Sequence, residues 1–284
     1  MASLLGEDGL VPAVCGARRL YVRRSLPLPG KEQKAEREET RGGCLGGLAR
    51  HGVDHNPSPP RSVGAMLNET TFAAAAAQLC EADPDLAAIV ELHGVPEFWA
   101  REPGLETLVL LILEQQVSLA SARAAYDRLE TRLGGLSTTG ILASTDAELR
   151  ADGFSRQKAR YVRVLSSAIE NGSFDLDVVA SLDDEAARAA LVTLPGIGPW
   201  TAEVYLLSAL RRPDTWPVGD IALQEGARRA RGLEARPSPD ELEAIGEAWR
   251  PNRATAARIL WHLYLSDPRP VRRAAARQPS APGR

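Results

Sequence analysis

The stretch Leu194-Pro195-Gly196-Ile197-Gly198-Pro199-Trp200-Thr201-Ala202 decides the fold of this 284-residue chain. It lies between two runs of helical apolar periodicity, Asp183 to Thr193 and Thr201 to Leu210. The two glycines, at positions i and i+2, allow a turn so tight that another backbone can approach it closely. The stretch therefore predicts two helices joined by a short hairpin.

Capping signals mark the ends of these two helices. Ser181 is placed as an N-cap of the first helix, with the acidic Asp184 three residues later, as in a capping box. Pro199 suits the first turn of the second helix, where its missing N–H costs nothing. The unpaired amides of that turn lie at the positive end of a helix dipole, so the hairpin favours a phosphate oxygen.

Composition indicates a helical protein of the cytoplasm. The chain is 44% hydrophobic and only 5% aromatic, and no apolar run reaches the ~20 residues of a membrane span. The N-terminus lacks the apolar core of a secretory signal. The three cysteines, Cys15, Cys44 and Cys80, are too widely spaced for a disulfide framework or a metal site.

Charge is distributed unevenly along the chain. Residues 1–65 carry 10 Lys and Arg against 7 Asp and Glu, and residues 267–284 carry 5 against 1. Residues 66–266 therefore hold 19 basic and 29 acidic side chains within a total net charge of −3. An acidic body can still bind DNA, because backbone amides at helix ends need no net charge, but its unaided binding should be weak.

The pattern divides the chain into three parts and predicts an all-α fold. Residues 1–65 show no helical or strand period, and we expect them to be disordered, with no strands. Residues 66–266 form a series of helices, of which Leu105 to Leu129 is the longest periodic segment and opens as a buried central helix. The Arg-rich residues 267–284 are expected to be a loose tail.

Five motifs occur in an informative order: LEQQVS, GFSRQKARYV, LPGIGPWTAE, WPVGD and WRPNRATAARILW. Together they cover most of residues 90–265, and they resemble the helix-hairpin-helix (HhH-GPD) DNA glycosylase superfamily, in particular its DNA-3-methyladenine glycosylase II branch. The resemblance implies two helical subdomains that flank an active-site cleft, into which the damaged nucleotide is flipped.

Asp220 is the candidate catalytic residue. Its position after Gly219 and before an apolar run predicts a helix N-cap, which alone would be a structural role. The resemblance implies catalysis, because the family places its aspartate about one helix beyond the hairpin. A carboxylate there can stabilise the oxocarbenium character of the sugar and orient or deprotonate the attacking water.

The resemblance also implies an aromatic pocket for a cationic base. Trp200 and Trp261 match aromatic pocket positions of the family, and Tyr205 falls near a third, although Val204 holds the matching position. Core packing on a terminal helix is nearly as good an explanation of Trp261. The other tryptophans, Trp99, Trp216 and Trp249, are assigned to the core or to subdomain seams.

DNA contacts follow from the same resemblance. Gln116 matches the residue that fills the gap left by the flipped base, and an equal alternative is a polar helix end that caps a buried turn. The backbone amides of Gly196 and Gly198 are expected to hold a phosphate, with Thr201 beside them. The backbone carbonyls that match a family site for Na⁺ or K⁺ are those of Val192, Leu194 and Ile197.

Two departures from the wider superfamily narrow the activity. Relatives that also cut the backbone carry a nucleophilic lysine just after the hairpin, where this chain has Trp200, so we expect a monofunctional enzyme. No cysteine follows Cys80, which excludes the four-cysteine iron–sulfur cluster of other relatives, and no cofactor is required.

The sequence therefore predicts a monomeric base-excision enzyme that acts on alkylated purines in double-stranded DNA and does not bind membranes. Three alternatives remain open: a glycosylase for a deaminated or oxidised base, a non-catalytic DNA-binding hairpin module, and a helical interaction scaffold.

Overall fold

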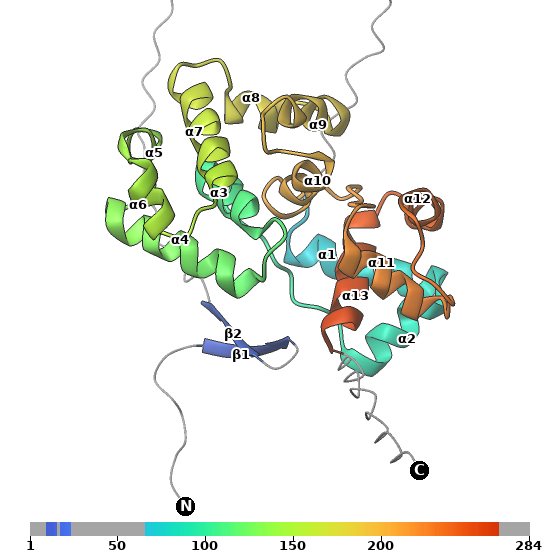
Figure 1. Ribbon diagram of the computed structural model, residues 1–284. Coiled ribbons are helices and arrows are strands. Elements are labelled where there is room, and N and C mark those ends of the chain that lie inside the picture. The colour runs from blue at the N-terminus through green and yellow to red at the C-terminus, as the bar shows by residue number, and fades with distance from the viewer. Residues whose placement is uncertain (1–9, 16–17, 24–65, 267–284) are drawn as a thin grey trace, which may run out of the picture.

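The computed structural model describes residues 10–15, 18–23 and 66–266, and its helical part forms two lobes (Figure 1). The small lobe takes elements from both ends of this part of the chain: α1 (Glu69–Ala82), α2 (Pro84–His93), α11 (Ile221–Ala230), α12 (Pro239–Gly246), the 3₁₀ helix η1 (Glu247–Trp249) and α13 (Arg253–Ser266). The large lobe is one continuous segment: α3 (Leu105–Glu114), α4 (Leu119–Leu133), α5 (Thr138–Ala143), α6 (Asp146–Ala151), α7 (Arg156–Glu170), α8 (Leu176–Ser181), α9 (Asp184–Val192) and α10 (Pro199–Ser208). The prediction of an all-α fold with two helical subdomains is confirmed for residues 66–266.

Each lobe has its own hydrophobic core, and α3 lies at the centre of the larger one. The α3 side chains Leu108, Val109, Leu111 and Ile112 are all fully buried, as the nearly continuous apolar run predicts. The predicted helix from Leu105 to Leu129 is in fact two helices, because the chain breaks at residues 115–118. The break occurs where the apolar run ends and the polar residues Gln115, Gln116 and Ser118 follow.

Two segments of the chain, residues 94–104 and 209–215, connect the two lobes and lie side by side. In the first segment, the amide of Arg101 donates to the carbonyl of Ser208 at 2.8 Å. Arg101 also forms an ion pair with Glu114 of the large lobe at 2.9 Å. Its guanidinium lies 4.7 Å from the ring of Trp99, and that of Arg258 on α13 lies 4.6 Å from the same ring. The predicted assignment of Trp99 to a seam is therefore confirmed.

The helix before the hairpin is capped by a residue other than the predicted one. Ser181 is the last residue of α8, and the N-cap of α9 is Asp183, whose carboxylate accepts from the amide of Ala186 at 2.8 Å. Leu182 and Asp183 form the turn between the short helices α8 and α9. Pro199 does begin α10, as predicted.

A two-stranded antiparallel hairpin, β1 (Leu10–Cys15) and β2 (Arg18–Arg23), corrects the prediction that residues 1–65 contain no strand. Leu10 pairs with Arg23 and Cys15 with Arg18. The rest of the segment, residues 1–9 and 24–65, and the predicted tail 267–284 lie outside the described residues.

Asp83 joins four parts of the small lobe through one buried carboxylate. It caps α2 by accepting from the amide of Asp85 at 3.0 Å, and it accepts from the indole N–H of Trp249 at 2.8 Å and from Arg231 at 2.6 Å. Burial opposes ionisation of Asp83, but the hydrogen bonds from Trp249 and Arg231 outweigh it and hold its pKa below the ordinary value of 3.8.

We expect Asp83→Asn to lower the free energy of unfolding by about 2–4 kcal/mol at neutral pH, because it leaves buried donors of Arg231 and Trp249 without a charged acceptor. A depressed pKa stabilises the fold above the unfolded-state value and loses that contribution as the pH falls. Urea unfolding at a series of pH values should therefore show a shallower loss of stability below about pH 4 in the variant. An equal slope in both proteins would contradict this role.

Candidate active site

Asp220 begins α11 and lies where the two lobes meet. Its carboxylate accepts from the amide of Leu223 at 2.7 Å, which confirms the predicted N-cap. The same carboxylate accepts from the indole N–H groups of Trp200 at 2.8 Å and Trp261 at 3.0 Å. Trp200 belongs to α10 in the large lobe and Trp261 to α13 in the small lobe. Asp220 is thus held by one tryptophan from each side.

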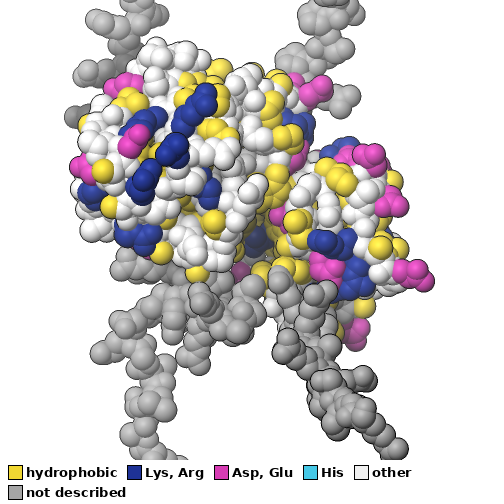
Figure 2. Space-filling view, in the orientation of Figure 1, with side chains coloured by type: hydrophobic (Ala, Val, Ile, Leu, Met, Phe, Trp, Pro, Cys, Tyr) yellow, Lys and Arg dark blue, Asp and Glu magenta, His cyan; other side chains and the backbone are white. Residues whose placement is uncertain are grey.

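The hydrogen bonds leave part of this carboxylate available. Oδ1 accepts from both Leu223 and Trp261, whereas Oδ2 accepts only from Trp200. A carboxylate has about four lone-pair sites, so Oδ2 retains a site for a further donor such as a water molecule. Asp220, Trp200 and Trp261 are all partly exposed. Figure 2 shows a hollow between the two lobes with hydrophobic side chains along its walls.

The hairpin turn presents free amides, as its sequence predicts. Gly196 has φ +94°, a conformation that side chains rarely adopt, and a Cβ there would lie 2.3 Å from Cγ of Tyr161. Gly198 is the exposed N-cap of α10 and has open space around it. The amides of Gly196 and Gly198 donate to no group among the described residues. Two free donors at a helix N-terminus form a site that suits an anion.

Gln115 fixes the hairpin to the end of α3, a role that sequence reasoning missed. Its side-chain amide donates to the carbonyl of Gly196 at 2.8 Å and to the hydroxyl of Thr201 at 3.0 Å. Thr201 is only 2% exposed. The prediction that Thr201 contacts DNA is therefore corrected: it lies on the inner side of α10, where its hydroxyl is an anchor for Gln115.

Lys158 of α7 also stabilises the C-terminal end of α3. Its ammonium donates to the carbonyls of Leu113 at 2.7 Å and Gln115 at 2.8 Å, which have no helical partners at the end of α3. Burial lowers the pKa of this lysine. The signal that could have found it is compositional, since Lys158 is the only lysine after residue 34 in an arginine-rich chain.

Gln116 follows directly and is exposed, with φ +58°. Its side chain makes no hydrogen bond to any described residue, while Lys158 caps the end of α3. Because Lys158 satisfies the carbonyls at the end of α3, the alternative in which Gln116 caps this helix end is excluded. Insertion into DNA stays a prediction, and the strained backbone is consistent with a residue held in place for function.

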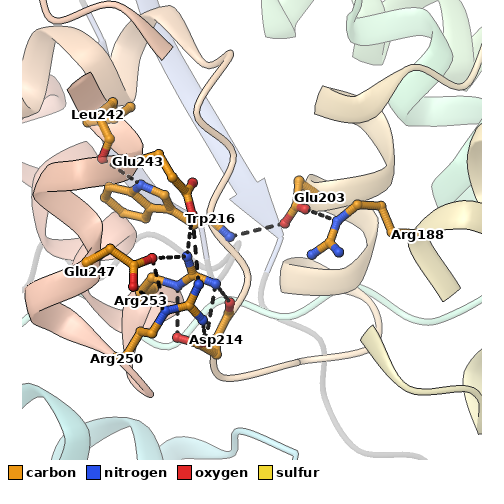
Figure 3. A network of polar contacts seen from close by, with 9 residues as sticks. All are labelled: Arg188, Glu203, Asp214, Trp216, Leu242, Glu243, Glu247, Arg250 and Arg253. Carbon is orange, nitrogen blue, oxygen red and sulfur yellow. Dashed lines mark hydrogen bonds and ion pairs between the residues drawn. The ribbon is translucent and has the colours of Figure 1, made fainter. Parts of the chain in front are cut away.

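Glu203 holds the loop between α10 and α11, which ends at Asp220. Figure 3 shows the contacts of Glu203. This nearly buried carboxylate on α10 accepts from the side chain of Arg188 and from the backbone amide of Trp216 at 3.1 Å. The indole of Trp216 in turn donates to the carbonyl of Leu242 at 3.0 Å. Earlier in the loop, Asp214 pairs with Arg253 at 2.9 Å. The loop before Asp220 is therefore tied to both lobes.

Tyr205 does not belong to the site. It is 1% exposed in the core of the large lobe, and its hydroxyl accepts from the amide of Gly104 at 3.0 Å. The prediction that it binds substrate is corrected, because the residue lies on the buried side of α10. Trp216 and Trp249 are 3% and 2% exposed and pack edge to face, which confirms their assignment to the core.

The carbonyls of Val192, Leu194 and Ile197 all lie at the turn between α9 and α10. Val192 ends α9, so its carbonyl has no helical donor, and the carbonyl of Leu194 accepts from the amide of Ile197 at 3.0 Å. Carbonyl oxygens at the negative end of a helix dipole are suitable ligands for a monovalent cation. Within residues 66–266 no cluster of three or more His, Cys, Asp or Glu side chains could hold a metal ion, and no helix has the length and apolar character to cross a bilayer.

Comparison with known proteins places this site in a family. Residues 109–251, half of the chain, match the model of the HhH-GPD superfamily of base excision DNA repair proteins, and the chain belongs to that superfamily. The match runs from α3 to the 3₁₀ helix η1 and its turn, so it includes the hairpin, Trp200 and Asp220.

Relatives that are similar in sequence are named for DNA repair, and several are named DNA-3-methyladenine glycosylases. The chain is 34% identical over 63% of its length to a "Probable bifunctional transcriptional activator/DNA repair enzyme AlkA" of Mycobacterium tuberculosis. DNA-3-methyladenine glycosylase 1 of Schizosaccharomyces pombe is 28% identical over 64% of this chain and 90% of its own length. The chain spans 37% of the mycobacterial protein and 64% of a Bacillus subtilis relative.

A solved structure shows the same architecture with DNA. The S. pombe 3-methyladenine DNA glycosylase Mag1 in complex with abasic DNA superposes with a TM-score of 0.63 at 25% identity, over 66% of this chain and 95% of Mag1.

Proposed function

We propose that this protein is a base-excision repair DNA glycosylase that hydrolyses the N-glycosidic bond of alkylated purines of the 3-methyladenine type. The observation that carries the proposal is the carboxylate of Asp220, held between Trp200 and Trp261 at the meeting of the two lobes. Membership of the superfamily and the names of the relatives support the substrate class.

The reaction needs little from the protein, because an alkylated purine is already cationic and leaves readily. After the nucleotide is flipped out of the duplex, the aromatic surfaces of Trp200 and Trp261 offer stacking and cation–π attraction to the base. Departure of the base develops oxocarbenium character on the sugar. The Asp220 carboxylate stabilises that charge, and its free Oδ2 lone pair positions the attacking water or takes its proton.

DNA is held by backbone groups at the hairpin. The free amides of Gly196 and Gly198 bind one phosphate, and Gln116 enters the gap left by the flipped nucleotide. A Na⁺ or K⁺ ion on the carbonyls of Val192, Leu194 and Ile197 would add a positive charge beside that phosphate. The partner is double-stranded DNA with a damaged base, and the protein acts as a monomer.

The experiment that tests this function is base release from methylated duplex DNA by the purified chain. We expect free 3-methyladenine and an intact strand that breaks only after alkali, because the position for a nucleophilic lysine holds Trp200. Strand breaks without alkali would contradict the monofunctional mechanism. Failure to release any methylated base, with binding to abasic-site DNA retained, would move the search to other lesions or to a binding role.

A further inference from the structure

An arginine-lined cavity lies on the large lobe between α6 and α7, apart from the site of Asp220. It has a volume of about 110 Å³ and is lined by Asp146, Arg150, Phe154, Ser155, Arg156, Ala159, Arg160 and Arg163. Figure 2 shows basic side chains gathered on this lobe, over the region where Figure 1 places α6 and α7. Four guanidinium groups around one small cavity are unusual in a domain that is acidic as a whole.

Three of the four arginines have no ion-pair partner among the described residues. Arg163 forms an ion pair with Asp146 and donates to the carbonyl of Ser144 at 2.7 Å. Within residues 66–266, Arg150, Arg156 and Arg160 form neither an ion pair nor a side-chain hydrogen bond. The hydrogen bond and charge of Arg163 lower the pKa of Asp146, and the charges of Arg150 and Arg156 contribute. The cavity thus keeps about three uncompensated positive charges.

Helix geometry explains why these side chains converge. Arg156, Arg160 and Arg163 are spaced i, i+4 and i+7 and share one face of α7, and Arg150 extends from the neighbouring α6. The first turn of α7 adds the positive end of the helix dipole. An anion with several oxygens, such as a phosphodiester, matches an arginine cluster because guanidinium groups bind such oxygens in pairs.

Helix α7 also supports both parts of the DNA site. Lys158, in its first turn, holds the carbonyls that precede Gln116, and Tyr161 packs directly against Gly196 of the hairpin. Arg156, Arg160 and Arg163 lie on the opposite face of this helix, so a duplex that contacts both the hairpin and the arginine cavity must pass the N-terminal turn of α7. The groups that such a duplex presents there are phosphates.

We propose that the cavity of Arg150, Arg156, Arg160 and Arg163 binds a backbone phosphate of the DNA duplex, separate from the phosphate at the hairpin. This inference rests on the proposed function. It supplies the electrostatic contact that a domain with 29 acidic and 19 basic side chains otherwise lacks. It also fixes the direction in which the duplex leaves the lesion site.

The salt dependence of DNA binding tests the proposal. Affinity for a duplex with a stable abasic-site analogue would be measured by fluorescence anisotropy at several salt concentrations, for wild type, Arg156→Gln, Arg160→Gln and the double variant. Each lost phosphate contact should lower the slope of log affinity against log salt by about one and weaken binding about tenfold at low salt. The matched control is Arg236→Gln, an exposed arginine of the small lobe with the same change of charge.

A second measurement identifies the phosphate. Single phosphates of the duplex would be replaced in turn by uncharged methylphosphonates. At one position outside the hairpin site, wild type should lose affinity while the double variant loses none. The inference is overturned if the variants keep the wild-type slope, or lose no more than Arg236→Gln. Base release by wild type reports the proposed function separately, so failure of that activity and failure of the arginine site give different results.

Discussion

Replacing Asp220 by Asn should lower the rate of base release by about 1,000-fold or more while the protein still folds and binds DNA. Asn is as good an N-cap as Asp, and its carbonyl can still accept from the amide of Leu223. What disappears is the negative charge next to the developing oxocarbenium ion and the lone pair of Oδ2. Single-turnover release of 3-methyladenine measures the rate, and binding to abasic-analogue DNA measures the retained affinity.

The control for this variant is Asp83→Asn. Asp83 is also a carboxylate that caps a helix and accepts from a tryptophan indole, but it lies within the small lobe and has no place in the proposed chemistry. We expect it to lower stability and to leave the rate of base release unchanged at a temperature where it is folded. An Asp220→Asn protein with wild-type activity would exclude Asp220 as the catalytic residue.

Replacing Gly196 by Ala should destabilise the protein by about 3 kcal/mol or more, the second large effect. The new methyl group adds the strain of a positive φ, and it would lie 2.3 Å from Cγ and 2.7 Å from Cβ of Tyr161. Because those atoms are at the root of the tyrosine side chain, a rotation of the ring cannot relieve the overlap. Thermal unfolding should show a melting temperature lower by about 6–12 °C.

Gly198→Ala is the matched control in the same turn. Gly198 has φ −88° and no atom within 4 Å of an added Cβ, so its replacement should cost only about 1 kcal/mol or less. Alanine keeps the backbone amide, but its methyl group projects into the open space in front of the turn, where a bound phosphate backbone would approach, so the variant should fold normally and bind abasic-analogue DNA more weakly. Equal stability of the two variants would contradict the packing of the hairpin on Tyr161.

Local signals in the sequence were enough to predict the hairpin, the Asp220 N-cap and the central helix. Each depends on residues within one or two turns of each other, such as Gly219-Asp220 before an apolar run. The apolar run from Leu105 also predicted a buried helix, although not its end, because a break at a buried helix end depends on what surrounds it. A capping residue between two short helices, Asp183 in place of Ser181, was missed for the same reason.

The contacts that assemble the site could not be predicted, because they join residues far apart in the chain. Gln115 reaches Thr201 across 86 positions, and Lys158 reaches Leu113 across 45. The sequence also does not show which residues of α10 face the site and which face the core. Eight successive residues of that helix, from Thr201 to Ser208, are buried, so periodicity cannot distinguish pocket from core. The resemblance places Tyr205 and Thr201 at the site, and periodicity offers no signal that would exclude them.

The two side-by-side connecting segments have a mechanical consequence. The large lobe leaves the small lobe at residues 94–104 and returns at residues 209–215, and the hydrogen bond from Arg101 to Ser208 ties these two segments together. Because both connections between the lobes lie at one place, they define a single hinge line between the lobes. Such a connection favours rotation of one lobe about that line over twisting or sliding. A movement about that line would carry Trp200 of the large lobe toward or away from Asp220 and Trp261, which both belong to the small lobe.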